Sequence, residues 1–406
     1  MDEFIPPPIS PSPPVLPGGL AMTDQHLSAE VAPPISTGWR RISPVVYAGL
    51  GVLLVSAVLG IFVAGELGAF LMATWEVVLF ATMCVLAYVG LEAKAARVLS
   101  RVMLCLLLLL GVGFNVSSTY LAIASDPPGV LPAGTSALLA LLGYLSLFAG
   151  GVALLAALPA MRRLATGLTG TQEWTSVRAL ALGAVSAFTT LCLVPLVVLG
   201  EPPLLMMLQG VPDGSTVFDD GRGAAGMFRD QIYSLNWTLV AATLAVGYGV
   251  RRNWPETLER LGLRRLSARH IGLGILLTGL LLGLGYFTDE VITRTWQYFN
   301  WRTTDLTALE ALFGPLISPV GAVVTGVTAG LGEEVAVRGI LQPRLGILLS
   351  NLFFTSLHAY QYSWDGLASV FVIGLALGFI RKKTSTSVSA LVHGGYDFVL
   401  VMMEVG

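Results

Sequence analysis

Apolar runs separated by short polar segments dominate the chain after its first 43 residues. A helix needs roughly 20 apolar residues to cross the hydrocarbon core of a bilayer, and about eleven runs reach or approach that length. The pattern therefore predicts an all-α fold, a polytopic membrane helix bundle with about 11 transmembrane helices in contact with the lipid bilayer. The expected helices are approximately residues 44–64, 69–91, 103–124, 135–159, 179–200, 236–250, 271–287, 314–333, 347–360, 366–380 and 386–405.

The first 43 residues differ from the rest of the chain. They are rich in Pro, Ser and Gly and show little hydrophobic periodicity. This composition is typical of a disordered tail with some polyproline-II character, and it is weak evidence for a docking partner. The segment also lacks the basic start and the apolar stretch of a cleavable signal peptide. We therefore expect residues 1–43 to form a disordered, Pro-rich tail.

Composition and charge agree with a membrane protein. The chain is 54% hydrophobic and 12% charged, whereas soluble domains carry about 25% charged residues. It has no basic block of the kind that binds nucleic acid, so no nucleic-acid partner is expected. If the N-terminus is cytoplasmic, 19 of the 23 Lys and Arg residues fall on the inner side, which is the bias seen in membrane proteins. The four on the outer side would be Arg222, Arg229, Arg294 and Arg302.

Two polar stretches interrupt the apolar pattern. Residues 201–235 predict a long outer loop that could carry a short interfacial helix, and residues 254–269 predict an amphipathic helix on the inner surface. The second stretch divides the chain into an N-terminal transmembrane bundle of unknown role, 44–250, and a core, 251–406, that carries nearly all candidate chemistry. The three cysteines lie in apolar runs and are expected to be small core residues rather than disulfide partners or zinc ligands: Cys84, Cys105 and Cys192.

Adjacent carboxylates, Glu333 and Glu334, lie at the end of one apolar run, with Arg338 four residues beyond the second. A charged side chain at bilayer depth costs roughly 2.5–3.5 kcal/mol on insertion scales, so it usually faces the protein interior and marks a functional site. Residues four apart share a helix face, so Arg338 can hold Glu334 ionised, whereas Glu333 points elsewhere and stays available to take a proton. Glu333 is therefore a candidate general base. A structural ion pair at a membrane boundary is the alternative.

Two of the four histidines lie in later apolar runs: His358, and His393 with Asp397 on the same helix face. A lone buried histidine is more often a packed core residue, but His358 and His393 could converge with Glu333 on one water molecule. A base would activate the water, and two imidazoles would orient it and stabilise an oxyanion, as acyl hydrolysis requires. A straight helix from Gln342 would bury His358 about 20 Å deep, so convergence requires residues 340–348 to follow the interface or the helix to tilt.

Three motifs occur in order on successive apolar runs: Glu333-Glu334-x-x-x-Arg338, Phe354-x-x-x-His358 and His393-x-x-x-Asp397. This ordered set resembles the motifs of the CAAX protease and bacteriocin-processing (CPBP) family over roughly residues 251–406, and Phe371-x-x-Gly374 fits a weaker intermediate motif. The resemblance implies an intramembrane glutamic protease that cleaves membrane-associated peptides or proteins and needs no cofactor. Eukaryotic relatives remove the last three residues after a prenylated cysteine. An integral protein of the bacterial inner membrane with a cytoplasmic N-terminus is expected.

By resemblance, Glu333 activates water, His358 helps to position it, and His393 forms an oxyanion hole with the residue at 397. The family usually has Asn at that position, whereas this chain has Asp397. An ionised carboxylate would repel an oxyanion. Asp397 must therefore be protonated, be paired with His393, or face away from the site.

Other functions remain open at this point. Glu333, His358, His393 and Asp397 could be mixed nitrogen and oxygen ligands of a zinc protease, although the chain has no HExxH pair on one helix. A membrane scaffold or a bacteriocin-immunity protein could keep the motifs for stability alone. A transporter is less well supported, because the two halves of the sequence show no repeated pattern of segments.

Overall fold

The computed structural model describes residues 42–124, 132–161, 166–167, 175–209 and 223–405. The predicted Pro-rich tail, apart from its last two residues, lies outside the described residues. The division at residue 250 stays a prediction.

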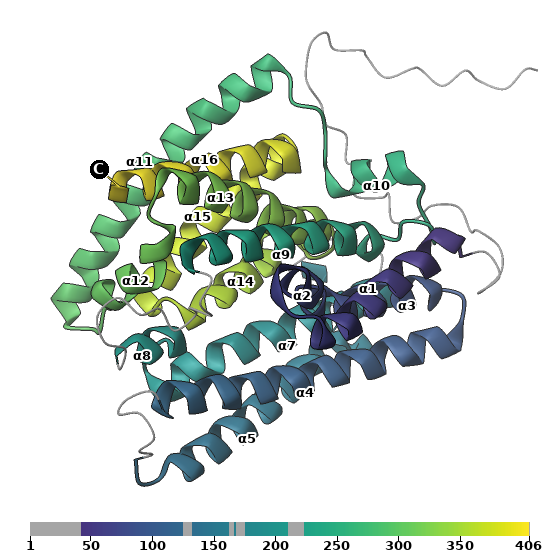
Figure 1. The fold of residues 1–406 in the computed structure, drawn as a ribbon, viewed down its shortest axis with the longest axis horizontal. Coiled ribbons are helices and arrows are strands. Elements are labelled where there is room, and N and C mark those ends of the chain that lie inside the picture. Colours follow the sequence, from purple (N-terminus) through teal and green to yellow (C-terminus); the bar gives the residue numbers. More distant parts are fainter. Residues whose placement is uncertain (1–41, 125–131, 162–165, 168–174, 210–222, 406) are drawn as a thin grey trace, which may run out of the picture. The chain divides into compact units, whose positions relative to one another are not determined.

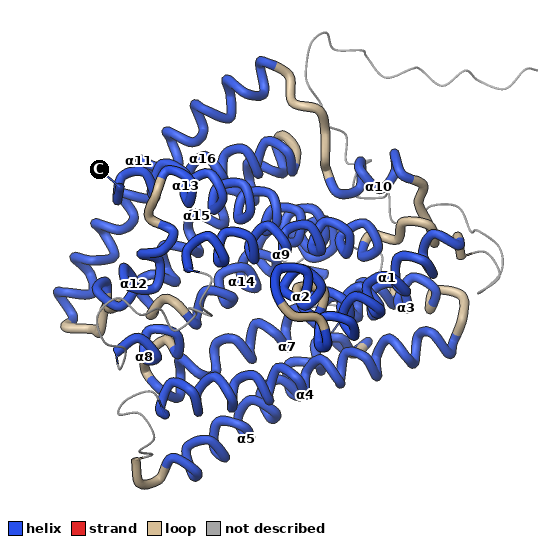
Figure 2. The backbone as a smooth tube through the Cα atoms, viewed as in Figure 1, coloured by secondary structure: helices blue, strands red, loops and turns tan. Residues whose placement is uncertain are grey.

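All regular secondary structure in the described ranges is helical, and none of these residues forms a strand (Figures 1 and 2). This confirms the all-α fold class. The longer elements in chain order are α1 (Pro44–Phe62), α2 (Gly65–Met72), α3 (Trp75–Val89), α4 (Lys94–Ala124), α5 (Thr135–Ala153), α7 (Ser176–Leu199), α8 (Pro203–Gln209), α9 (Gly223–Ala245), α10 (Trp254–Leu261), α11 (Ala268–Phe299), α12 (Leu306–Phe313), α13 (Pro319–Thr328), the π-helix η6 (Ala329–Leu341), α14 (Gln342–Leu357), α15 (Trp364–Lys383) and α16 (Thr386–Val405). Short 3₁₀ turns are η3 (Leu154–Ala157), η4 (Pro159–Met161), η5 (Gly314–Leu316) and η7 (His358–Tyr360).

Nine helical stretches in the described part of the chain are long and apolar enough to cross a membrane. The predicted count of eleven is therefore not confirmed. Two features account for the difference: α9 is not among the nine, and residues Pro319–Tyr360 form one stretch of 42 residues where two helices were expected. Many large apolar side chains on these helices are exposed, including Ile275, Leu276 and Phe287 on α11. Such a surface is stable in lipid and not in water, so the chain is an integral membrane protein.

Three sequence predictions need correction. Residues 223–235 belong to α9 and not to an outer loop, although the short α8 does lie in the predicted loop. The predicted amphipathic helix 254–269 ends at Leu261, because Gly262 adopts a left-handed conformation (φ 72°) that closes the helix. Cys105 is exposed and is therefore not the core residue that was expected, whereas Cys84 and Cys192 are partly buried and Cys84 packs against a hydrophobic core cluster; all three are free of disulfides, as expected.

The polar side chains of α9 are paired with the two helices that come early in the chain. Arg229 forms an ion pair of 2.5 Å with Glu66 on α2. The hydroxyl of Ser234 donates a hydrogen bond of 3.1 Å to Glu76 on α3, and the Trp237 indole donates one of 2.8 Å to the Phe70 carbonyl. On its other side α9 packs against η6 and α13. α9, of which only residues 236–245 were predicted to be helical, therefore joins the N-terminal helices to the core.

Close glycine contacts bring α16 against α13 and η6. A Cβ atom added to Gly330 would lie 2.6 Å from the backbone nitrogen of Gly394, and one added to Gly326 would lie 2.6 Å from the carbonyl oxygen of Gly394. Distances under 3.0 Å exclude any side chain at these positions. Gly394 therefore allows the backbones of α16, α13 and η6 to approach closely, and this approach brings the preceding residue, His393, against η6.

Candidate active site

The two adjacent glutamates lie on a π-helix, where sequence analysis expected an ordinary helix. The segment Ala329–Leu341 continues α13 with the wider π geometry. Such segments are rare, and they occur frequently at functional sites. Glu334 points into the protein, with its side chain 0% exposed, whereas the Glu333 side chain is 39% exposed. The two carboxylates therefore lie in different environments, as their spacing predicted.

Glu334 is held by three side chains in the interior. Its carboxylate lies 3.2 Å from Nη1 of Arg338, whose side chain is 1% exposed, and it accepts hydrogen bonds from Ser389 and His393. Arg338 also donates a hydrogen bond of 3.0 Å to the Gly374 carbonyl. The predicted pairing of Glu334 with Arg338 is confirmed. Every oxygen of Glu334 is occupied, so this carboxylate is poorly placed to take a proton from water.

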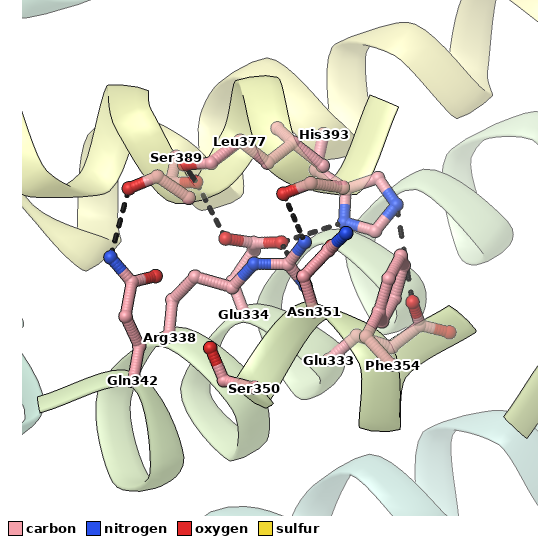
Figure 3. Close-up of polar contacts among 12 residues, drawn as sticks. Glu333, Glu334, Arg338, Gln342, Ser350, Asn351, Phe354, Leu377, Ser389 and His393 are labelled. Atoms are coloured by element: carbon pink, nitrogen blue, oxygen red, sulfur yellow. Dashed lines mark hydrogen bonds and ion pairs between the residues drawn. The ribbon is translucent and has the colours of Figure 1, made fainter. Parts of the chain in front are cut away.

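His393 connects the two glutamates (Figure 3). Its Nδ1–H donates to Glu334 over 3.1 Å, and its Nε2 lies 3.9 Å from the Glu333 carboxylate. The same Nε2 lies 3.5 Å from Asp397. Of the three arrangements left open for Asp397, the geometry excludes the one in which it faces away. Glu334 fixes the ring of His393 so that Nε2 is directed toward Glu333 and Asp397.

His358 reaches the same region because α14 does not run straight. Gly346 has φ 76° and ψ 176°, which breaks the helix four residues after its start at Gln342. A side chain would be strained at this φ, so glycine is suited to the break. The first part of α14 therefore has a different direction from the part that carries Phe354 and His358. The straight helix on which that depth argument was based is therefore not present.

The orientation of His358 is set locally. Its Nδ1–H donates a hydrogen bond of 3.0 Å to the Phe354 carbonyl, which leaves Nε2 as the ring nitrogen without this bond. The ring of Phe354 lies among three charged or polar partners, with centroid distances of 4.9 Å to His358 and 6.1 Å to His393. The Arg338 guanidinium stacks 4.2 Å above the Phe354 ring. The Phe354 ring thus contacts the Arg338 guanidinium and both imidazoles.

One cavity of about 1140 Å³ collects the predicted site residues. Glu333, His358, His393 and Asp397 all line it, whereas Glu334 and Arg338 lie behind its wall. Residues of α9, among them Gln231 and Ser234, form part of the same wall. The described residues that line the cavity include no Lys or Arg but six carboxylates: Asp230, Asp289, Glu310, Glu333, Asp397 and Glu404.

Sequence analysis missed Tyr362, which lies in the loop between two membrane-spanning stretches. Its ring stacks on that of His358 at a centroid distance of 6.1 Å and an interplanar angle of 23°, and it lines the cavity. Burial raises the pKa of Tyr362 to about 12, and the nearby carboxyls of Asp397 and Glu333 add to the increase. The phenol therefore stays protonated at neutral pH. The sequence signal was only its spacing of four from His358. Ser389 was also missed, because no local motif marks it.

The positions of the site residues also indicate whether they are arranged to bind a metal ion. Within the described ranges, no group of three His, Cys, Asp or Glu side chains is arranged to hold a metal ion. The zinc alternative therefore has no ready ligand set among these residues. The absence of a cofactor stays a prediction.

A family model described as type II CAAX prenyl endopeptidase Rce1-like matches residues 315–399. The matched segment contains Glu333, Glu334, Arg338, His358, His393 and Asp397. No curated protein and no solved structure matches the chain. The match, on helices suited to a membrane, supports assignment of this chain to the CAAX protease (CPBP) family, which is a family of proteases.

Proposed function

We propose that the protein is an intramembrane endopeptidase that hydrolyses peptide bonds of membrane-associated peptides or proteins with water activated by Glu333. One observation carries the proposal. Of two adjacent glutamates, Glu334 is engaged by Arg338, Ser389 and His393, while Glu333 faces the cavity that His358 and His393 also line. This division leaves one carboxylate as a proton acceptor and uses the other to orient an imidazole.

The proposed reaction begins with a water molecule between Glu333 and His358. Glu333 takes one proton as the water oxygen bonds to the carbonyl carbon of the substrate peptide. His358 orients the water by accepting its second hydrogen at Nε2, since Nδ1–H is engaged by Phe354. The carbonyl oxygen becomes an oxyanion, and protonated His393 donates to it from Nε2. When the C–N bond breaks, Glu333 returns its proton to the amine, so that the base is regenerated.

The position of Asp397 suggests a role in place of the asparagine usual in the family. At 3.5 Å from Nε2 of His393, its carboxyl can compensate the charge of a protonated imidazole. A neutral Asp397 could itself donate a hydrogen bond to the oxyanion, as an asparagine amide would. Tyr362, which stays protonated and lies against His358, is a further hydrogen-bond donor in the same cavity.

The charge of the cavity suggests which substrates it favours. Its described lining carries six carboxylates and neither Lys nor Arg. A cleft lined by charges of one sign concentrates ligands of the opposite sign. We therefore propose that the enzyme prefers substrates with basic residues near the scissile bond, and that it disfavours a free C-terminal carboxylate placed in the cavity.

A cleavage assay with the purified protein tests the proposed function. The wild type and the Glu333→Gln variant are compared on a peptide library in detergent or in liposomes, and products are identified by mass spectrometry. Glu310→Gln is the matched control, because Glu310 is an exposed carboxylate of the same cavity. We expect cleavage by the wild type and the control, and a rate lower by about 10²- to 10⁴-fold for Glu333→Gln. Equal cleavage by all three would refute the role of Glu333.

A further inference from the structure

A buried polar network joins three N-terminal helices to the turn that contains His358. Its centre is Asn115 on α4, which is 1% exposed. The side-chain Nδ2 of Asn115 donates hydrogen bonds of 3.0 Å to Ser146 on α5 and 2.9 Å to the Leu191 carbonyl on α7. Its Oδ1 accepts a hydrogen bond from the hydroxyl of Tyr360. Both polar atoms of this amide are therefore satisfied, each by a different part of the fold.

The contact with α7 has a specific cause. Pro195 lies inside that helix, four residues after Leu191. Proline has no N–H group, so the Leu191 carbonyl loses its partner within the helix. An unpaired carbonyl is costly in a membrane interior, and the Asn115 amide supplies the missing donor. The amide is thereby held in a fixed place, with its oxygen directed at Tyr360.

Tyr360 is the last residue of η7, the 3₁₀ turn that begins at His358. Its ring packs against Phe114 on α4 at a centroid distance of 5.4 Å, and its hydroxyl reaches Asn115. The backbone N–H of Tyr362 bonds to the His358 carbonyl over 2.9 Å, and the Tyr362 ring stacks on the His358 ring. The turn is therefore anchored at Tyr360, while His358 and Tyr362 on either side of it face the cavity.

We propose that Asn115 and Tyr360 are positioning residues that hold His358 in place, and that this is one purpose of the N-terminal helices. The inference rests on the proposed function for its catalytic consequence. His358 lies where α14 ends and η7 begins, so its position depends on the turn as well as on the helix. The imidazole itself has one local bond, to Phe354. The anchor at Tyr360 supplies the second constraint, from a helix more than 240 residues earlier.

The competing explanation is that the network only holds helices together, as polar groups often do in membranes. The two explanations differ in whether the bond from Tyr360 to Asn115 has an effect on His358 that the bond from Asn115 to Ser146 lacks. Tyr360→Phe removes the bond to the turn and keeps the ring that packs on Phe114. Ser146→Ala is the matched control, because it removes another bond of the same Asn115 amide on α5. A network that only packs helices would respond similarly to both changes.

Two measurements on the full-length protein test the proposal. The first is kcat and KM for a cleaved peptide. Tyr360→Phe should lower kcat by about 10- to 100-fold and change KM by less than about twofold, because a misplacement of 1 Å can cost on the order of 100-fold in rate. The second is NMR of protein labelled with ¹⁵N-histidine, in which His358→Gln assigns one of the four histidine signals. The Nδ1–H signal of His358 should shift or broaden in Tyr360→Phe and stay unchanged in Ser146→Ala.

A wild-type kcat together with an unchanged His358 signal in Tyr360→Phe would overturn the proposal. Equal effects of Tyr360→Phe and Ser146→Ala would also overturn it. If the wild type cleaves no peptide, the proteolytic function fails, and the NMR comparison still decides whether Tyr360 positions His358. If Tyr360→Phe does not fold, Phe114→Leu takes its place, because it removes the ring against which Tyr360 packs and keeps every bond of the Asn115 amide; an unchanged His358 signal in that variant would overturn the proposal.

Discussion

Glu333 and Glu334 should respond differently to the same isosteric change. Glu334→Gln removes a charge that is fully buried and that faces Arg338, Ser389 and His393. Glu333→Gln removes a charge from a side chain that is 39% exposed and whose carboxylate lies 3.9 Å from Nε2 of His393. The pair of variants therefore compares a structural carboxylate with a reactive one while chain position and side-chain size are nearly constant.

The expected losses of stability follow from these contacts. Removing one partner of a buried ion pair typically costs about 3–5 kcal/mol, because the remaining charge is left without compensation. Glu334→Gln leaves the Arg338 guanidinium without a compensating charge, although the amide oxygen of the new side chain can still accept one hydrogen bond. Glu333→Gln should cost about 0.5 kcal/mol or less, as is usual for exposed positions. Since proteins are stable by only about 5–15 kcal/mol, the first change should lower the unfolding temperature clearly.

The expected losses of cleavage activity do not follow the expected losses of stability in the two variants. Glu333→Gln removes the proposed base, which should reduce the cleavage rate by about 10²- to 10⁴-fold with the fold intact. Glu334→Gln should reduce both stability and rate, because His393 loses the acceptor that orients its ring. The assay is thermal unfolding and peptide cleavage on the same detergent preparation, with Glu310→Gln as the control for loss of an exposed cavity charge. If Glu333→Gln unfolds as readily as Glu334→Gln, or if it cleaves at the wild-type rate, the proposed division between the two glutamates is wrong.

Four further outcomes are expected. Asp397→Asn, which restores the residue usual in the family, should keep or increase cleavage; loss of cleavage would mean that the carboxylate itself is required. EDTA or phenanthroline should leave the cleavage rate unchanged, and stoichiometric zinc that is lost in His393→Ala would favour the metalloprotease. Thr303→Cys and Arg265→Cys should label from opposite sides of the membrane, since they flank the 32 residues of α11, which are about 48 Å long; labelling from one side would break the topology. Peptides with an amidated C-terminus should be cleaved faster than the same peptides with a free carboxylate, and the reverse preference would refute the charge argument.

The local part of the site could be predicted from the sequence. Residues four apart on a helix meet, so the pairs Glu334–Arg338 and His393–Asp397 followed from spacing alone, and the structure contains both. Hydropathy gave the helical class and most of the apolar segments for the same reason: it depends on neighbouring residues only. The roles of Glu333 and His358 in a reaction stay predictions.

The remaining features depend on contacts between distant segments. No spacing rule links Ser389 to Glu334 across 55 residues, or Tyr360 to Asn115 across 245. The break at Gly346 could be suspected from a glycine but not distinguished from a regular helix, and the π geometry of Ala329–Leu341 has no compositional signal. The first half of α9, residues 223–235, was assigned to a loop because its polar residues are typical of one, and only their partners on α2 and α3 explain them.

The polarity of α9 has a consequence for how the protein is made. A segment that carries Arg229, Asp230 and Gln231 would partition poorly into lipid by itself during synthesis. Its partners Glu66 and Glu76 belong to helices translated roughly 160 residues earlier, and they bind Arg229 and Ser234. α9 is therefore expected to pack against α2 and α3, which are already inserted, as soon as it leaves the translocation channel. Correct insertion of α9, and with it the cavity wall, would then depend on the earlier synthesis of α2 and α3.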